Sequence, residues 1–366
     1  MTILVLCWEG NLCGTLGFYA QAFRRRGVQL VCAAPGFPWN GNLEEWLKLC
    51  PETPSLILHP EADVPFLPRG LTHVDIPTAC FQVDTYAYTQ RRISWSMLFD
   101  SVLVFHPGYD VKFQEAGHPG AQFIPHAIEP GLFSGAPLQR IYEVGWVGQI
   151  GGAVYHTRAR ILQKLATSFR MNELSRRYLS AELALVYHQS EIVVNVGRDD
   201  CPQDANVRTF EAMAAGALLI TSLPSELSAI GFEDGVHFVG YRREAELENL
   251  VRKYLADERA RQGIAKAGRE LVLCEHTYDR RIDVLLDLIG GLDKKRFAPA
   301  RAWSEARVRL AYLDYFAGNG ALECASAELP SIARRNPIKA AAGAAILARA
   351  WGRRIPGRIR SRLAPN

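Results

Sequence analysis

The residues best placed by type and spacing to do chemistry lie in one stretch, Arg198–Ser222, which reads RDDCPQDANVRTFEAMAAGALLITS. An apolar run before it predicts a buried strand that ends at Gly197, and the pattern after the polar loop predicts a helix over Asn206–Ala215. Arg208 and Glu211 are three positions apart, so they share one side of this helix near its start.

The start of such a helix suits an anion, because its first N–H groups have no partner inside the helix. Asp204 or Asn206 would cap it, and Arg208 adds a cation with forked donors that suits a diphosphate. Glu211, one turn deeper, can accept hydrogen bonds from both hydroxyls of a ribose. The competing interpretation is an ordinary surface ion pair between Arg208 and Glu211, worth about 0.3 kcal/mol.

A sheet must position these residues, and the whole chain alternates short apolar, β-branched runs with helical patterns. This alternation is typical of parallel sheets with crossover helices, in which ligands bind beyond the carboxyl ends of the strands. The expected strands are Ile3–Cys7, Val28–Ala33, Ser55–His59, Ala79–Val83, Ser101–Phe105 and Gln122–Ile124, then Glu143–Val147, Ile192–Val196, Leu218–Thr221 and His237–Val239.

A segment rich in Gly and Pro, Pro130–Arg140, separates the two series of strands. We therefore expect an α/β protein with two Rossmann-like lobes, over residues 1–135 and 136–290, facing an interdomain cleft. Residues 291–366 should form a helical, basic extension, since residues 292–366 carry 15 Lys and Arg but 5 Asp and Glu. Its expected helices are Arg301–Phe316, Leu322–Arg334 and Ile338–Trp351.

Composition narrows the class of protein. The 8 cysteines include no C-x-x-C pair, which argues against a zinc site and favours a reducing compartment such as the cytoplasm. Gly10, Gly14 and Gly17 are spaced G-x3-G-x2-G rather than G-x-G-x-x-G, which disfavours hydride chemistry on a dinucleotide. No apolar run reaches the ~20 residues that span a bilayer.

Six phrases of the chain resemble, in the same order, the group 1 glycosyltransferases, and most of all their CgeB-like (spore-maturation) branch. The phrases are Phe81–Tyr86 (FQVDTY), Phe99–Tyr109 (FDSVLVFHPGY), Phe123–Pro130 (FIPHAIEP), Gly145–Gly148 (GWVG), Arg208–Gly216 (RTFEAMAAG) and His276–Arg281 (HTYDRR). The resemblance implies the GT-B fold, a sugar-nucleotide donor, a cleft between the lobes, and no requirement for a bound metal or other cofactor.

The resemblance also implies roles for residues of the second lobe. In the family's E-x7-E pattern, the second carboxylate falls on Glu211, where the family binds the donor ribose. The first falls on Gln203, which can hydrogen-bond a sugar hydroxyl but cannot ionise, so the stereochemical outcome stays open. Asn206 and Arg208 complete this part of the expected donor site.

The loop Gly148–Gly152 resembles the family's stretch near the pyrophosphate or the base, with Gln149 projecting from it. Gly148 and Gln149 are therefore expected to contact the donor. Arg158, one turn into the next helix, is a candidate for a further phosphate contact, and an ordinary surface arginine is the alternative.

Sugar transfer needs a stabilised leaving group and, on an inverting route, a base for the acceptor hydroxyl. Asp84 directly follows the strand Ala79–Val83 and is the candidate base, although an Asp at a strand end is also a common loop cap. His126 is the second catalytic candidate, with a structural histidine as the alternative. His106 and Glu9 are further options.

The end of the chain carries a separate signal. Residues 341–351 are apolar, and five arginines follow between 353 and 362. Such segments lie on anionic membrane surfaces or on acidic partners, so attachment to the inner face of the membrane through residues 341–362 is one expectation. A disordered, solubilising tail is another, and nucleic acid is disfavoured because stacking aromatic residues are absent there.

These observations predict a cytoplasmic, metal-independent enzyme that moves a sugar from a nucleoside diphosphate sugar to a hydroxyl. The acceptor would be a glycan, a lipid-linked intermediate or a protein. Two alternatives stay open: a sugar-nucleotide epimerase or hydrolase on the same fold, and an inactive, membrane-recruited binding subunit for which Gln203 would be tolerable.

Overall fold

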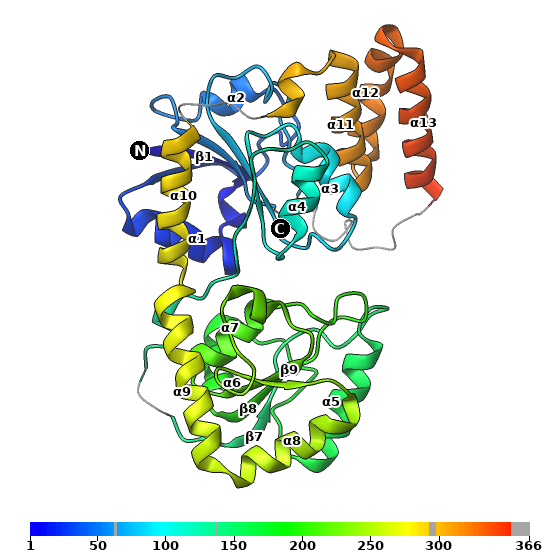
Figure 1. Ribbon diagram of the computed structural model, residues 1–366. Helices are drawn as coiled ribbons and strands as arrows, with labels where there is room; N and C mark the ends of the chain where they lie inside the picture. Colours follow the sequence, from blue (N-terminus) through cyan, green and yellow to red (C-terminus); the bar gives the residue numbers. More distant parts are fainter. Residues whose placement is uncertain (62–63, 136–137, 293–297, 353–366) are drawn as a thin grey trace. The chain divides into compact units, whose positions relative to one another are not determined.

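The computed structural model describes residues 1–61, 64–135, 138–292 and 298–352. The chain forms two compact units (Figure 1): unit 1 contains Met1–Phe123 and the chain from Leu285 on, and unit 2 contains Ile124–Val284. This division differs from the expected breaks at residues 135 and 290. Unit 2 begins earlier than the Gly- and Pro-rich segment, and the C-terminal helices are grouped with unit 1.

Unit 1 is built on a six-stranded parallel sheet in the order β2-β1-β3-β4-β5-β6. The six expected strands are all present, as β1 (Thr2–Trp8), β2 (Gln29–Ala33), β3 (Leu56–His59), β4 (Thr78–Gln82), β5 (Ser101–Val104) and β6 (Ala121–Phe123). The chain leaves β1 for β2 on one side and returns to β3 on the other. The switch point, where ligands bind in such sheets, therefore lies between β1 and β3.

Helices connect the strands of unit 1, as the crossover of parallel strands requires. They are α1 (Gly14–Arg25), α2 (Leu43–Leu47), α3 (Thr89–Ser96) and α4 (Tyr109–Glu115). The helix α10 (Tyr278–Leu292) contains the division between unit 2 and the C-terminal part of unit 1.

Unit 2 contains a four-stranded parallel sheet in the order β10-β9-β8-β7. Its elements are β7 (Tyr142–Gly145), α5 (His156–Ser168), α6 (Ser180–His188), β8 (Ser190–Asn195), α7 (Val207–Ala214), β9 (Leu218–Ser222), β10 (Val239–Tyr241), α8 (Glu244–Ala256) and α9 (Glu258–Glu275). Val144 of β7 pairs with Met171 on one side and with Ile192 of β8 on the other. The switch point of unit 2 therefore lies between β7 and β8.

Two hydrophobic cores lie on opposite faces of this sheet, because alternate side chains of a strand point to opposite sides. Val193 of β8 packs with residues of α6 and α7. Its neighbours Ile192 and Val194 pack with residues of α5 and α8. The sheet is thus buried on both faces, which leaves its strand ends as the place for a polar site.

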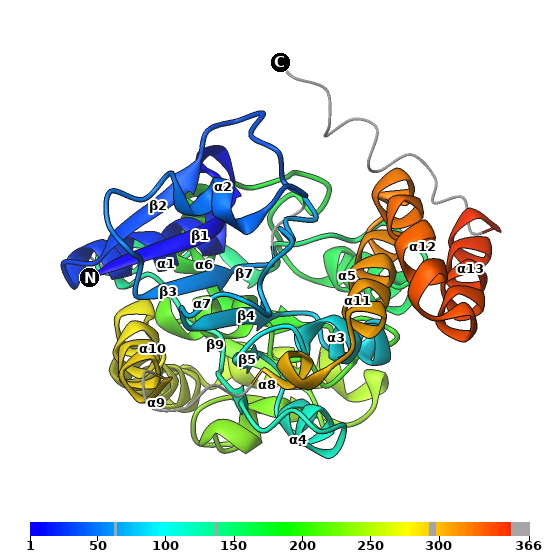
Figure 2. The same ribbon diagram turned by 90° about the horizontal axis from the view of Figure 1, so that it is seen from above.

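Three C-terminal helices, α11 (Glu305–Gly318), α12 (Leu322–Arg335) and α13 (Pro337–Gly352), confirm the helical extension (Figure 2). Tyr312 and Tyr315 of α11 attach it to the rest of unit 1. Tyr312 donates to the carbonyl of Pro68 at 2.8 Å, and the Oη of Tyr315 lies 3.0 Å from Nε2 of His59. The arginines between 353 and 362 lie outside the described residues. Within the described ranges, each helix falls short of the length and apolar character that crossing a membrane requires.

Glu328 of α12 makes a buried polar attachment to the rest of unit 1. Its carboxylate is fully buried, accepting from Nε of Arg69 at 2.7 Å and from Nη1 of Arg309 at 2.9 Å. A buried charge is tolerated only when it is paired in this way. Arg69 lies between β3 and β4 in the chain, so this carboxylate joins two parts of unit 1 that are distant in sequence.

We expect Glu328→Ala to lower the free energy of unfolding by about 3 kcal/mol, because it leaves two guanidinium groups without their buried partner. Urea denaturation measures this change. Glu323→Ala, on an exposed position of the same helix, is the control and should alter it by no more than about 0.5 kcal/mol. Equal losses in the two variants would contradict an anchoring role for Glu328.

Candidate functional site

The expected helix over Asn206–Ala215 is present as α7, and it leads back into the sheet as predicted. Phe210, Met213 and Ala214 are fully buried against the core on one side of α7. Gly216 has φ of +71° and closes the helix in the left-handed conformation that glycine adopts most readily. α7 therefore stands directly after the carboxyl end of β8.

The two ends of α7 differ in charge. At its end, Arg140 donates to the carbonyl of Gly216 at 2.7 Å and Arg269 donates to that of Ala214 at 2.9 Å. Cations at a helix C-terminus offset the helix dipole. At its start, the side chain of the N-cap residue Asn206 accepts no hydrogen bond from the helix. The first N–H groups of α7 are thus without a side-chain cap from this residue.

The neighbouring helix α5 is capped from a distance. The carboxylate of Asp199 accepts from the backbone N–H of His156 at 3.0 Å and of Thr157 at 3.3 Å. Because this carboxylate occupies the start of α5, the start of α7 is the better place for an anionic ligand in unit 2.

Arg208, on the first turn of α7, spans the switch point of the sheet. Its Nε donates to the carbonyl of Val147 beyond β7 at 2.7 Å, and its Nη1 donates to Oδ1 of Asn195 in β8 at 2.7 Å. The guanidinium also lies over the ring of Trp146, 4.2 Å from its centre. Arg208 is therefore held in one position by three contacts.

Gly148 leaves the space that Arg208 occupies. A Cβ atom built at Gly148 would lie 2.8 Å from Nη2 of Arg208 and 3.2 Å from Cζ2 of Trp146. Any other residue at this position would push the guanidinium away from the loop. The sequence expectation that Gly148 belongs to the site therefore has a steric basis.

Glu211 lies one turn further along α7 and is half-buried. Burial raises the pKa of its carboxyl to about 7, with the charge of Arg208 acting in the opposite direction. In the described part of the chain, no ion pair or hydrogen bond engages this carboxylate. Arg208 and Glu211 are thus not the ordinary surface ion pair that the sequence also allowed.

Arg158 is neither a surface residue nor fully available to a ligand. It is 3% exposed, its Nε donates to the carbonyl of Val196 at 2.8 Å, and its Nη1 donates to the carbonyl of Gln149 at 2.8 Å. Burial, and then the charge of Arg208, lower the pKa of this guanidinium to about 10. Arg158 braces the Gly148–Gly152 loop, with Tyr155 packed against it at 4.4 Å.

The remaining donor-site candidates surround the start of α7. The Nδ2 of Asn206 lies 3.4 Å from Oδ1 of Asn195 and 3.3 Å from Oδ2 of Asp204. Gln203 is half-buried, and its carbonyl accepts from the N–H of Glu226 at 3.0 Å. The side chain of exposed Gln149 donates to the carbonyl of Gly151 at 2.8 Å. Gln203, Asn206 and Gln149 thus belong to the loops around Arg208.

Asp84 belongs to unit 1, two residues beyond the end of β4. It is exposed, and its Oδ1 accepts from the hydroxyl of Tyr86 at 3.3 Å. The ring of Tyr86 meets that of His106 edge-on at 4.9 Å. The structure thus brings two acid–base candidates, Asp84 and His106, to the carboxyl ends of adjacent strands.

His126 lies in unit 2, whereas the sequence placed it in the first lobe. The reason is a pair of attachments that the sequence does not reveal. Ile128 pairs with Thr277, and Arg281 donates to the carbonyls of Pro125 at 2.8 Å and His126 at 3.1 Å. The ring of His126, 7% exposed, packs edge-on against Phe210 of α7.

Sequence reasoning missed two residues that position Arg208. Asn195 is fully buried, and a polar residue inside an otherwise apolar strand was a signal for it. Trp146, 1% exposed, was quoted only as part of a phrase. The backbone N–H of Trp146 donates to Oδ1 of Asn172 at 2.9 Å, and the backbone carbonyl accepts from Nδ2 of Asn172 at 2.7 Å. No sequence pattern indicated a role for Asn172.

Comparisons with known proteins address the same region. Residues 138–287 match the model of the family described as "Glycosyl transferase-like". This match contains α7 and the Gly148–Gly152 loop. A comparison with curated protein sequences finds no match.

Solved structures resemble the chain over most of its length. HepE of Anabaena, in complex with UDP-glucose, is 13% identical with a TM-score of 0.55, covering 81% of this chain and 100% of its own. Sucrose-phosphate synthase from Thermosynechococcus elongatus is 14% identical with a TM-score of 0.54, covering 80% and 100%. A glycosyltransferase from Rickettsia africae is 11% identical with a TM-score of 0.52, covering 80% and 99%. The chain therefore has the GT-B fold of these structures, and residues 138–287 resemble the glycosyl transferase-like family.

Proposed function

We propose that the chain is a glycosyltransferase that binds a nucleoside diphosphate sugar in unit 2 and transfers its sugar to a hydroxyl of an acceptor. The observation that carries this proposal is the arrangement at the start of α7. A cation held by three contacts lies at the start of α7, where Asn206 provides no side-chain cap. One turn further along the helix is a half-buried carboxylate that no hydrogen bond from the described residues engages.

The diphosphate end rests on Arg208. Its Nε and Nη1 are committed to the protein, so the guanidinium is already in place when the ligand arrives. The first N–H groups of α7 add donors and the positive end of the helix dipole. Charge on the leaving diphosphate grows during transfer, and preorganised donors stabilise it most effectively at that stage. The proposal therefore invokes no metal.

The ribose end rests on Glu211. An ionised carboxylate accepts hydrogen bonds from two adjacent hydroxyls, and this is the chemistry that a ribose offers. A half-buried carboxylate without such partners is costly, which is why its pKa stands at about 7. Binding of the ribose would supply the missing partners and favour the ionised form.

The sugar end is the less specified part of the proposal. Gln203 can bond a sugar hydroxyl as donor or acceptor without carrying a charge. Asp84 of unit 1 is the proposed base, since it is exposed at a strand end, and His126 is a further candidate for contact with the donor. Arg158 is proposed to support the loop of Gly148 and Gln149 rather than to act on the sugar.

We also propose an acceptor, a location and a branch of the family for this chain. A hydroxyl of a glycan, lipid-linked intermediate or protein serves as the acceptor. The CgeB-like assignment rests on the six phrases, and cytoplasmic location with attachment to a membrane surface through residues 341–362 stays a prediction.

The first test is binding of UDP-glucose, the ligand named for HepE, followed by other nucleoside diphosphate sugars. We expect Glu211→Ala to weaken binding at least about tenfold, because hydrogen bonds to a charged group contribute about 1.5–3 kcal/mol. Isothermal titration calorimetry measures this. Glu270→Ala, at an exposed position of α9, is the control and should leave the affinity unchanged.

Three outcomes separate the candidate functions. Transfer of the sugar to an added glycan supports the proposal. Donor turnover that needs no acceptor would instead favour an epimerase or hydrolase. A chain that binds none of the nucleoside diphosphate sugars would contradict the proposal and favour an inactive binding subunit.

The raised pKa of Glu211 predicts a pH dependence of donor binding. Below a pKa of about 7 the carboxyl is protonated and cannot accept from both ribose hydroxyls. Affinity for UDP-glucose should therefore rise by up to about tenfold per pH unit from about pH 5 to about pH 7 and then level off. Glu211→Gln should bind weakly with no such rise. The same slope in this variant would assign the titration to another group.

The close approach at Gly148 predicts a further effect. Gly148→Ala would displace Arg208 from its contacts with Val147 and Asn195, since the guanidinium is the flexible neighbour of the added methyl group. We expect affinity for UDP to fall about tenfold, and the melting temperature to fall as well, because Gly148 has a φ of +155° that a residue with a Cβ rarely adopts. Gly151→Ala, where a Cβ meets open space, is the control. Full affinity in Gly148→Ala would show that the position of Arg208 does not matter for binding.

A further inference from the structure

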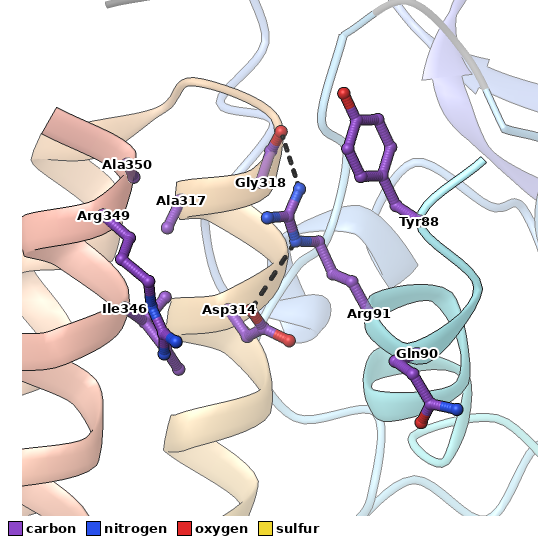
Figure 3. A pocket seen from close by; sticks show the side chains of 9 residues that line it. All are labelled: Tyr88, Gln90, Arg91, Asp314, Ala317, Gly318, Ile346, Arg349 and Ala350. Atoms are coloured by element: carbon purple, nitrogen blue, oxygen red, sulfur yellow. Dashed lines mark hydrogen bonds and ion pairs between the residues drawn. The ribbon is translucent and has the colours of Figure 1, made fainter. Parts of the chain in front are cut away.

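A cavity of about 520 Å³ lies in unit 1, lined by residues of α3, α11 and α13 and by Tyr88 just before α3 (Figure 3). This volume is within the range of small-molecule sites, about 300–1,000 Å³. Part of the lining is apolar, from Ala317 of α11 and Ile346 and Ala350 of α13. None of these residues belongs to the donor region, so the cavity needs its own explanation.

The charged groups of the cavity favour an anionic ligand. Arg91 of α3 and Arg349 of α13 extend from either side of α11, whereas Asp314 of α11 is the single carboxylate in the lining (Figure 3). Nε of Arg91 lies 3.7 Å from Oδ1 of Asp314, which is a loose pair. Nε of Arg349 bonds within its own helix to Ala345, and its two terminal nitrogens contact no described acceptor. Two guanidinium groups thus face one carboxylate.

Tyr88 adds a flat aromatic surface at the edge of the cavity. Its side chain is 68% exposed, and the guanidinium of Arg91 lies over its ring at 5.2 Å. Its φ of +59° is left-handed, a conformation that is unfavourable for a residue with a Cβ. Such backbone strain is concentrated at ligand sites, and here it keeps an aromatic ring in water beside an arginine.

A smaller hollow of about 80 Å³ continues the cavity toward the sheet and shares Tyr88, Arg91 and Gly318 with it. It reaches His59, the last residue of β3, and Glu61 beyond it. Glu61 has a φ of +51° and, with Tyr88, makes up the left-handed non-glycine residues of the described ranges. The combined groove thus runs from the end of β3 to the C-terminal helices.

The chemistry of this groove matches one class of ligand. Sugar rings present C–H groups that pack on an aromatic face and an apolar surface, while carboxylate or phosphate groups on a saccharide bond to arginine. We propose that the groove between α3, α11 and α13 is a binding site for an anionic saccharide, held by Arg91, Arg349 and Tyr88. This saccharide would be the acceptor of the sugar transfer, and that role alone rests on the proposed function.

The test is calorimetric titration of the full chain with trigalacturonate, with the neutral trisaccharide maltotriose and with inorganic phosphate. Trigalacturonate should bind at least about tenfold more tightly than either of the other two. Arg91→Gln, Arg349→Gln and Tyr88→Ala should each weaken it about tenfold. Arg334→Gln, an exposed arginine of α12 outside the groove, is the matched control and should leave the affinity unchanged.

A variant that changes no charge gives an independent measurement. A Cβ atom at Gly318 would overlap the side chain of Arg91, so Gly318→Ala should displace this arginine and reproduce the loss seen in Arg91→Gln. UDP-glucose affinity, measured on every variant, should not change, because the groove residues contribute nothing to the start of α7.

Several results would overturn the inference: no binding of trigalacturonate, equal binding of maltotriose or of phosphate, or binding that the three groove substitutions leave intact. The two proposals fail separately. Binding of trigalacturonate by a chain that binds no nucleoside diphosphate sugar supports the groove and contradicts the proposed function. Donor binding without trigalacturonate binding contradicts the groove alone.

Discussion

The guanidinium of Arg208 joins the carboxyl ends of β7 and β8 at the point where the order of strands reverses. The segments that follow two paired strands separate at such a point because they leave in opposite directions, and the gap between them exposes backbone carbonyls and polar side chains. Arg208 fills the gap by donating to Val147 and Asn195 while it lies on Trp146. Arg208 thereby connects α7 to the loop after β7, and its position requires a glycine at residue 148.

The two charged residues of α7 divide the work of binding between a fixed group and an available one. Arg208 has its protein partners in place, so little conformational entropy remains to be lost when an anion binds. Glu211 keeps its hydrogen-bonding capacity for a ligand and carries a raised pKa as the cost. A site of this kind is stable when empty and still has a strong interaction left for the donor. Arg158 also holds the Gly148–Gly152 loop in place by donating a hydrogen bond to the carbonyl of Gln149.

The sequence predicted the strands, α7 and the left-handed glycine at its end. These features follow from the spacing of apolar residues and the position of a glycine, both of which are local in the sequence. It did not predict how deep a residue lies. Arg158 was expected on the surface or on a phosphate, yet it is buried, since the segments that follow β7 and β8 cover its guanidinium. Asn195 was not predicted as a site residue, because its role comes from the hydrogen bond that it accepts from Arg208. Unit 2 begins earlier in the chain than the sequence predicted, because the pairing of Ile128 with Thr277 joins residues that are far apart in sequence.

The buried carboxylate of Glu328 has a consequence for the order in which the two units can fold during synthesis. Its partner Arg69 lies 259 positions earlier, with the whole of unit 2 synthesised between them. A nascent chain therefore holds Arg69 and His59 without their partners from α12 and α11 until those two helices have been synthesised. Unit 2, which is continuous, can complete its fold while unit 1 is still waiting for its last helices. Unit 1 is thus completed by residues that are synthesised on both sides of unit 2.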